Sequence, residues 1–330
     1  QKADGYEFIK VHNVLKPEVY DAICAEARAQ HLDVVGHIPH DTSVARAITC
    51  GQRTFEHFKG YINDRNLTLT GEDYVAVTRG AEVWNTPTFY NYRGQLRGDE
   101  ARRLMTTAPE MRYVSGRDRA RWLALADQPP QPVQQNVLPM SEKIFHDLLA
   151  IHARFLAGTD SGGGYPYHVP GFSLHEELRI MARNGMAAPE VLRTATIEPA
   201  IAMRREAELG TLEVGKRADL VLLARDPLAS IENLESIEGV MVRGIWLSRS
   251  SLDEMLAAIA AIDASSVQPA HPLTRADLDR ALETLEQLRA HGYPLREHFL
   301  GWLRFRLEAA GLPVARPLFE GIVPMSPDDD

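Results

Sequence analysis

Five short β-prone runs, spaced so that helices can lie between them, constrain the fold of this chain most strongly. They cover residues 6–11, 32–36, 53–55, 82–86 and 155–158. Pro17 suits a first helical turn, and apolar residues at i, i+4 spacing extend that helix to about Gln30. Asp41 or Thr42 can cap a second helix, and Gly51 can end it. This alternation predicts an α/β fold with a parallel sheet.

Four polar residues close these runs or directly follow them, and each can serve a metal ion. They are Lys10, His37, His57 and Asp160. All strand C-termini of a (β/α)8 barrel, also called a TIM-type barrel, open on one face, so residues far apart in sequence can meet there. A lone histidine is more often structural, but the ordered set at strand ends favours ligation. We therefore expect these four residues to form one metal site.

The rest of the chain lacks this regular alternation of predicted strands and helices. Residues 92–140 are polar and longer than a normal barrel connection, which predicts a lid or insertion with some helix. A hairpin around Arg243-Gly244 predicts a small β-unit, and helical apolar spacing follows it. We expect a partial barrel over residues 1–205, a small β-domain over 206–250 and a helical C-terminal extension over 251–330.

Charge and composition exclude several classes of function. A formal net charge of -9 argues against a nucleic-acid surface, which needs a concentrated face of Lys and Arg. No run of about 18 apolar residues predicts a membrane span. No signal peptide starts the chain, but the start looks internal, so an upstream signal could have been lost and the location stays open. Cys24 and Cys50 form no CxxC pair, and we expect two small core residues rather than a disulfide framework or a cysteine-rich zinc site.

Several short motifs occur in order along the chain. They are Phe8-Ile9-Lys10-Val11, Val35-Gly36-His37, Phe55-Glu56-His57, Ala157-Gly158-Thr159-Asp160-Ser161, Leu174-His175-Glu176-Glu177-Leu178, Ala195-Thr196 with Pro199-Ala200, and Gly215-Lys216-Arg217-Ala218-Asp219-Leu220. Together they resemble the amidohydrolase superfamily, in particular its bacterial imidazolonepropionase-like branch, which includes prolidase-like and carboxypeptidase-like enzymes. The similarity covers roughly residues 1–250, and the ordered set is more specific than any single motif.

The resemblance implies a role for each strand-end residue. Lys10 would be the lysine of strand four, often carboxylated to bridge two metal ions. His37 and His57 would come from strands five and six, and Asp160 from strand eight. None of the 12 histidines forms the His-x-His pair that the family carries on its first strand. We therefore expect strands four to eight here, with the missing strands supplied by a second polypeptide or by an upstream segment.

Further polar residues follow the predicted strands, where substrate contacts belong. These candidates for substrate binding are His12, His40, Tyr90, Tyr92, Arg93 and His168. For each of them, an exposed residue without a role is the alternative. His175 and Glu176 form half of a zinc-helix motif that lacks its second histidine, which favours helix packing.

These features predict a metal-dependent hydrolase of amide, cyclic amide or ester bonds, similar to dipeptidases and prolidases. We expect one or two divalent ions, zinc first, a small-molecule substrate, and Asp160 as the catalytic residue that moves protons. We expect no nucleic-acid or membrane partner, and a homo-oligomer is an option. Two alternatives stay open: a catalytically incomplete structural or regulatory remnant, and a deaminase of the same superfamily. The deaminase pattern has a glutamate where this chain has His40.

Overall fold

The computed structural model describes residues 2–63, 68–91, 96–129, 137–161 and 166–265, with single positions and short stretches between 275 and 321. The chain divides into two compact units, Gln1–Ser266 and Val267–Asp330. In the second unit, Leu282, Leu300, Leu307 and Leu318 form a small apolar cluster with Phe319 of η6 (Pro317–Phe319). The first unit holds every residue that the sequence suggests for a functional site.

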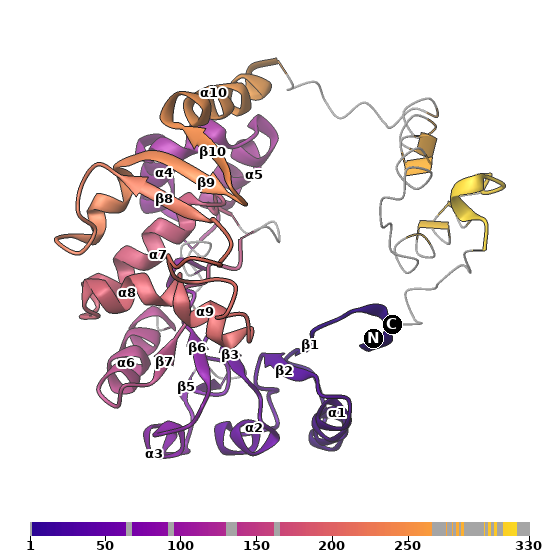
Figure 1. Cartoon of the computed structure of the whole chain (residues 1–330), viewed down its shortest axis with the longest axis vertical. Helices are drawn as coiled ribbons and strands as arrows, with labels where there is room; N and C mark the ends of the chain where they lie inside the picture. Colours follow the sequence, from indigo (N-terminus) through magenta and orange to yellow (C-terminus); the bar gives the residue numbers. More distant parts are fainter. Residues whose placement is uncertain are drawn as a thin grey trace. The chain divides into compact units, whose positions relative to one another are not determined.

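Parallel strands form the centre of the first unit (Figure 1). Strand β1 (Phe8–Val11) pairs with β2 (Asp33–Gly36), and the order β3–β6–β7 joins β3 (Thr54–Glu56), β6 (Trp84–Thr86) and β7 (Arg154–Phe155). The Arg53 N–H donates to Val34 O at 2.7 Å and links β2 to β3. All five predicted runs therefore overlap a strand, the last of them at Phe155 only, and among the described residues these strands form no closed barrel.

Helices cover the outer side of this row of strands. They are α1 (Pro17–Ala29), α2 (Val44–Cys50), α3 (Tyr74–Thr78) and α6 (Val137–Leu149), seen along the lower part of the first unit in Figure 1. A short antiparallel pair, β4 (Ile62–Asn63) and β5 (Thr68–Leu69), follows β3. The predicted caps of α2 are wrong, since Ser43 accepts the Arg46 N–H at 3.1 Å. Gly51 ends the helix in the left-handed region, as predicted.

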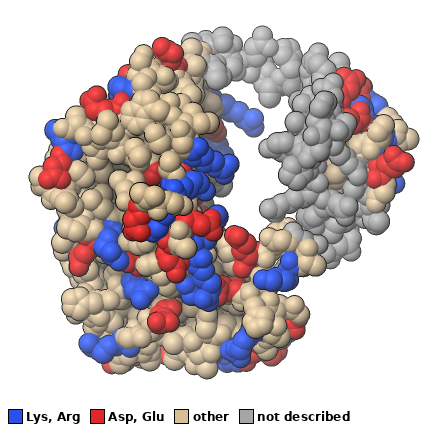
Figure 2. All heavy atoms as spheres, in the orientation of Figure 1, with Lys and Arg blue, Asp and Glu red and all other residues tan. Residues whose placement is uncertain are grey.

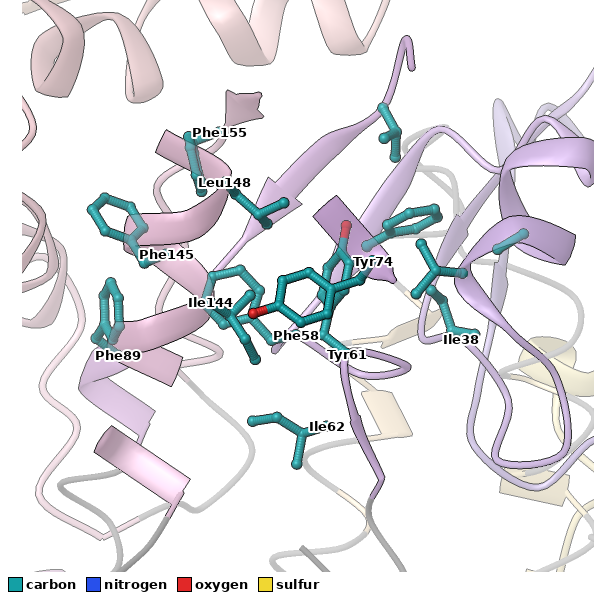
Figure 3. Close-up of a cluster of buried hydrophobic side chains, with 14 of the residues drawn as sticks. Ile38, Phe58, Tyr61, Ile62, Tyr74, Phe89, Ile144, Phe145, Leu148 and Phe155 are labelled. Atoms are coloured by element: carbon teal, nitrogen blue, oxygen red, sulfur yellow. The ribbon is translucent and has the colours of Figure 1, made fainter. Parts of the chain in front are cut away.

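The main core lies between the strands and the outer helices. Figure 3 shows aromatic and aliphatic side chains from the strands, from α6 and from the loops after β3 and β6 packed against one another. Phe145 of α6 lies 4.8 Å from Phe155 of β7 and 5.3 Å from Phe89, measured between ring centroids. The buried Tyr61 hydroxyl donates to Asn85 Oδ1 at 2.7 Å. This close packing holds the strand ends in fixed positions.

A disulfide joins Cys24 of α1 to Cys50 of α2, with their Cα atoms 5.5 Å apart. The expectation of two unpaired core cysteines is therefore wrong. The two residues lie in helices that flank β2, and sequence spacing does not show that their Cα atoms come within disulfide reach. The covalent bond closes a loop that contains β2 and His37.

The segment predicted as an insertion is helical where it is described. Helix α4 (Gly98–Thr107), the 3-10 helix η3 (Pro109–Tyr113) and α5 (Gly116–Ala126) have an apolar cluster of their own. That cluster includes Tyr167 and Val169, which belong to the loop after β7. The insertion therefore packs against a loop near the strand ends.

The last part of the first unit combines helices with a second sheet. Helices α7 (Phe172–Arg183), α8 (Ala188–Thr194) and α9 (Ile197–Ala202) precede an antiparallel sheet of β8 (Leu220–Leu223), β9 (Ile237–Val242) and β10 (Ile245–Ser248). The turn of the β9–β10 hairpin holds Arg243 and Gly244, as predicted. Helix α10 (Arg249–Ser265) follows and contacts the sheet. The segment limits at residues 205 and 250 remain predictions.

No helix in the described ranges combines the length and apolar character needed to cross a membrane. On the face shown in Figure 2, Lys and Arg side chains of the first unit lie next to Asp and Glu side chains. This mixture differs from the concentrated basic face that phosphate binding requires.

Candidate functional site

Three of the four predicted metal ligands line one cavity of about 730 Å³ in the first unit. Lys10 reaches it from β1, His57 from the end of β3, and Asp160 from the loop after β7. Residues Val35, Thr54, Glu56, Thr86 and Leu156 from the strands and their ends also line the cavity. The cavity therefore follows the inner face of the row of strands, with the predicted ligands near the strand C-termini.

His37 lies beside this cavity, in contact with two other histidines. Its ring centroid is 4.2 Å from that of His12 and 4.9 Å from that of His57, the latter in an edge-on arrangement. Burial lowers the pKa of His37 to about 3, and positive charge at His57 and His12 adds to the effect. His37 is therefore neutral at pH 7. Its Nδ1 hydrogen-bonds Asn13 Oδ1, which leaves the electron pair on Nε2.

The tautomer of His57 follows from a second hydrogen-bonded chain. The Thr88 hydroxyl lies 2.7 Å from both Pro87 O and His57 Nδ1, and when it donates to Pro87 O it accepts from Nδ1. In that arrangement His57 carries its proton on Nδ1. Nε2, which lies 3.8 Å from Asp160 Oδ2, then has the electron pair. An imidazole held in this way is suited to ligation through Nε2.

Left-handed backbone marks the same strand ends. His57, Thr88 and Asp160 have φ angles of 60°, 52° and 54°. Such conformations cost on the order of 1–3 kcal/mol each for residues other than glycine, and they concentrate at functional sites. A β-branched residue such as Thr88 is disfavoured there most strongly. The fold therefore holds these three residues in unfavourable backbone conformations that orient their side chains, at a cost in stability.

Asp160 has polar neighbours on its other side. Asn91 Nδ2 donates to Asp160 Oδ2 at 3.5 Å. His168 is buried, and burial lowers its pKa while the negative charge of Asp160 opposes the shift. The His168 ring lies 4.9 Å from the Tyr90 ring, and the Tyr90 hydroxyl donates to Tyr167 O at 2.9 Å. Two predicted substrate residues, Tyr90 and His168, thus lie together near Asp160, outside the residues that line the cavity.

The remaining predicted substrate residues have different surroundings. His12 is exposed and contacts His37, whereas His40 is half-buried and its backbone N–H donates to Asn13 O at 3.0 Å. Tyr92 and Arg93 lie outside the described residues. His175 sits in α7, where burial lowers its pKa. The structure therefore brings His12 to the predicted ligands and leaves His40 on the neighbouring loop.

The donor set fits a divalent ion in its chemistry, since zinc is bound in proteins by imidazole and carboxylate groups. In the described parts of the chain, no three His, Cys, Asp or Glu side chains are grouped closely enough to hold a metal ion. The 3.8 Å between His57 Nε2 and Asp160 Oδ2 comes near the roughly 3.4 Å expected for two ligands of one tetrahedral zinc ion. The His37 and Lys10 side chains would therefore have to move to add further ligands.

Four residues at the site were not predicted as site residues: Asn13, Thr88, Asn91 and Glu177. Asn13 follows β1, while Thr88 and Asn91 follow β6, and polar side chains just beyond a strand end were the available signal. Glu177 belongs to the motif Leu174-His175-Glu176-Glu177-Leu178, but the motif did not indicate what the residue contacts. Its buried carboxyl group accepts the N–H groups of Phe89 at 2.9 Å and Tyr90 at 2.7 Å from α7.

A row of parallel strands with outer helices defines an α/β protein. The similar solved structures imply a TIM-barrel-type arrangement, although the described strands form no closed barrel. The chain matches the model of the Amidohydrolase family over residues 12–247. The chain therefore belongs to this family. The matched range contains His37, His57 and Asp160, and Lys10 lies just before it.

Solved structures have a similar fold. A bottromycin amidohydrolase matches with a TM-score of 0.62 and 24% sequence identity, over 78% of this chain and 59% of the other. A Xaa-Pro dipeptidase with methionine bound in its active site matches with a TM-score of 0.53 and 22% identity, over 75% of this chain and 56% of the other. The chain thus spans less than two-thirds of the length of either structure. No curated protein matches the chain.

Proposed function

We propose that this chain carries the site of a metal-dependent hydrolase that cleaves amide bonds of small molecules. The observation that carries the proposal is the approach of His37, His57 and Asp160 at strand ends, within a chain of the amidohydrolase family. The solved structures of similar fold include an amidohydrolase and a dipeptidase. Dipeptides and N-acyl amino acids are therefore the first substrates to test, followed by cyclic amides and esters.

In this proposal His37, His57 and Asp160 hold a divalent ion, zinc first, and a carboxylated Lys10 would allow a second ion. With the proton on Nδ1 of each histidine, Nε2 is the ring atom that would bind it. A divalent ion supplies Lewis acidity, which polarises a carbonyl group and makes water more acidic. The neutral state of His37 at pH 7 suits it for this role.

Asp160 is the proposed proton carrier. Its carboxylate would take a proton from the attacking water and pass it to the leaving nitrogen. Asn91 donates to Oδ2 and so helps to fix which carboxylate oxygen faces the substrate. Tyr90 and His168 lie near Asp160 and would contact the substrate, and His12, His40, Tyr92 and Arg93 remain further candidates for that role.

We also propose that β1, β2, β3, β6 and β7 correspond to strands four to eight of a TIM-type barrel. Phe8 and Tyr6 line the cavity and are 43% and 38% exposed, whereas barrel interiors are filled by side chains. Additional strands, from another polypeptide or another segment, would cover them and pair with the open strand edge. A homo-oligomer is one way to supply such cover.

Replacing Asp160 with Asn tests the proposal. We expect turnover of dipeptides or N-acyl amino acids to fall about 10²- to 10⁴-fold at matched zinc content, because the amide cannot carry the proton. Substrate binding should change far less. Asp253→Asn makes the same chemical change at an exposed site on α10 and should leave turnover within about twofold of the parent. Near-normal turnover in Asp160→Asn would contradict the role of Asp160, and a parent that hydrolyses none of these substrates would favour a catalytically incomplete protein.

A further inference from the structure

We propose that Glu177 is a positioning residue for the candidate site: it holds the turn after β6 so that Thr88 fixes the proton of His57 on Nδ1. The inference rests on the proposed function for its consequence in catalysis. The geometry itself involves five residues from three parts of the chain: Glu177 in α7, the consecutive residues Thr88, Phe89 and Tyr90 after β6, and His57 after β3.

Glu177 lies inside the protein, on the face of α7 that contacts the turn after β6. Its exposed fraction is 0%, and each carboxyl oxygen accepts one backbone N–H: Phe89 to Oε1 at 2.9 Å and Tyr90 to Oε2 at 2.7 Å. No Lys or Arg forms an ion pair with Glu177 within the described ranges. Burial raises the pKa of Glu177 to about 8, which shows how strongly its charged form is disfavoured there. The role of this buried acid is to accept hydrogen bonds from the two backbone N–H groups.

The turn that Glu177 holds has an unfavourable backbone. Thr88 directly precedes Phe89, is 2% exposed, and has a φ angle of 52°. The left-handed region is sparsely populated by β-branched residues and persists only where surrounding contacts enforce it. The two hydrogen bonds to Glu177 fix the peptide planes immediately after Thr88. On the far side, the Tyr90 hydroxyl donates to Tyr167 O at 2.9 Å, which ties the turn to the loop that precedes His168.

The direction of the Thr88 side chain decides the tautomer of His57. With its hydroxyl proton donated to Pro87 O, Thr88 accepts the His57 Nδ1 proton at 2.7 Å. This leaves the electron pair of Nε2 facing Asp160. If the turn relaxed, Thr88 would move away from Nδ1 and the ring could exchange its proton between the two nitrogens. Half of the imidazoles, or more, would then present a proton instead of an electron pair to the site.

The test compares Glu177→Gln with Glu176→Gln in the 330-residue chain. Both variants change a carboxyl group to an amide on α7, but Glu176 faces Arg179 and Arg183 instead of the turn. The first measurement is the ¹⁵N chemical shift of the His57 ring nitrogens in metal-free protein, which separates the two tautomers. We expect a protonated Nδ1 in the parent and in Glu176→Gln, and a mixture of tautomers in Glu177→Gln.

The second measurement is zinc-supported turnover of an amide substrate. Residues that orient a ligand typically contribute about 10- to 100-fold to metal affinity or activity. We expect Glu177→Gln to lower kcat by that amount with little change in KM, and Glu176→Gln to stay within about twofold. A purely structural role would lower the folded fraction without changing the His57 tautomer. The parent tautomer and normal kcat in folded Glu177→Gln would overturn the proposal.

Two further observations keep the proposal testable if Glu177→Gln does not fold. In the parent, the Phe89 and Tyr90 amide protons should exchange slowly, and rapid exchange of both would overturn the proposal. Thr88→Ser keeps the hydroxyl and should retain the parent tautomer of His57, whereas Thr88→Val should lose that tautomer. Identical His57 tautomers in the two variants would also overturn the proposal. The tautomer does not depend on turnover. A tautomer shift in a chain that hydrolyses nothing would therefore uphold the positioning role and reject the proposed function.

Discussion

Removing the Cys24–Cys50 disulfide should destabilise the first unit without changing its fold. The bond closes a loop with a sequence separation of 26 that contains β2 and His37. The chain-entropy relation gives about 3.5 kcal/mol for a loop of this length at 25 °C. Other contacts between the two helical segments remain, including the buried hydrogen bond from the Tyr20 hydroxyl to Gln52 Oε1 at 2.6 Å. We therefore expect Cys24→Ala/Cys50→Ala to fold but to unfold more easily.

Thermal unfolding of the 330-residue chain measures this effect. For a unit of this size, about 3.5 kcal/mol corresponds to a fall in Tm on the order of 10 °C. A reducing agent should lower the Tm of the parent by a similar amount and leave the double variant unchanged. Thiol titration of the unfolded parent should find no free thiol. A parent whose Tm is insensitive to reductant and equal to that of the double variant would refute the reasoning.

Two further predictions concern the strand that carries His37. Because the pKa of His37 is about 3 in the folded chain and near 6.5 when unfolded, only the unfolded state gains a proton between these values, so stability falls as pH is lowered through that window. In this window the free energy of unfolding of the metal-free chain should fall by up to about 1.4 kcal/mol per pH unit. Urea titrations at several pH values should show a smaller pH dependence for His37→Gln. An equal pH dependence in both proteins would contradict the assignment. Gly36→Ala should destabilise by on the order of 3 kcal/mol, because φ is 112° and the added Cβ would lie 2.4 Å from Val11 O. Unchanged urea unfolding of Gly36→Ala would show that this backbone is not strained.

The parts of the fold that depend on local pattern could be predicted from the sequence. Each β-prone run overlaps a strand, and the hairpin at Arg243 and Gly244 forms where the turn residues indicated. The cap of α2 was misassigned because Asp41, Thr42 and Ser43 can all accept a helix N–H. Only the backbone path selects Ser43, whose ψ of 163° puts its hydroxyl at the helix start.

The parts that depend on tertiary approach could not be predicted. Helices α1 and α2 bring two cysteines to a Cα separation of 5.5 Å, a distance that spacing along the chain does not encode. Thr88 joins the site through a left-handed backbone that its residue type disfavours. Glu177 reaches the turn at Phe89 from 88 positions further along the chain. Functional sites are where local preference and final structure are expected to disagree.

Zinc binding by the metal-free 330-residue chain tests the central claim most directly. The protein would be titrated with Zn²⁺ by calorimetry, and turnover of a dipeptide would be followed in the same samples. His57→Ala removes a proposed ligand, and His146→Ala removes an exposed histidine of α6 as the control. We predict that one or two zinc ions bind the parent and His146→Ala and support turnover, and that His57→Ala binds at least about tenfold more weakly. Equal zinc affinity in all three proteins, or equal turnover with and without metal, would contradict the account.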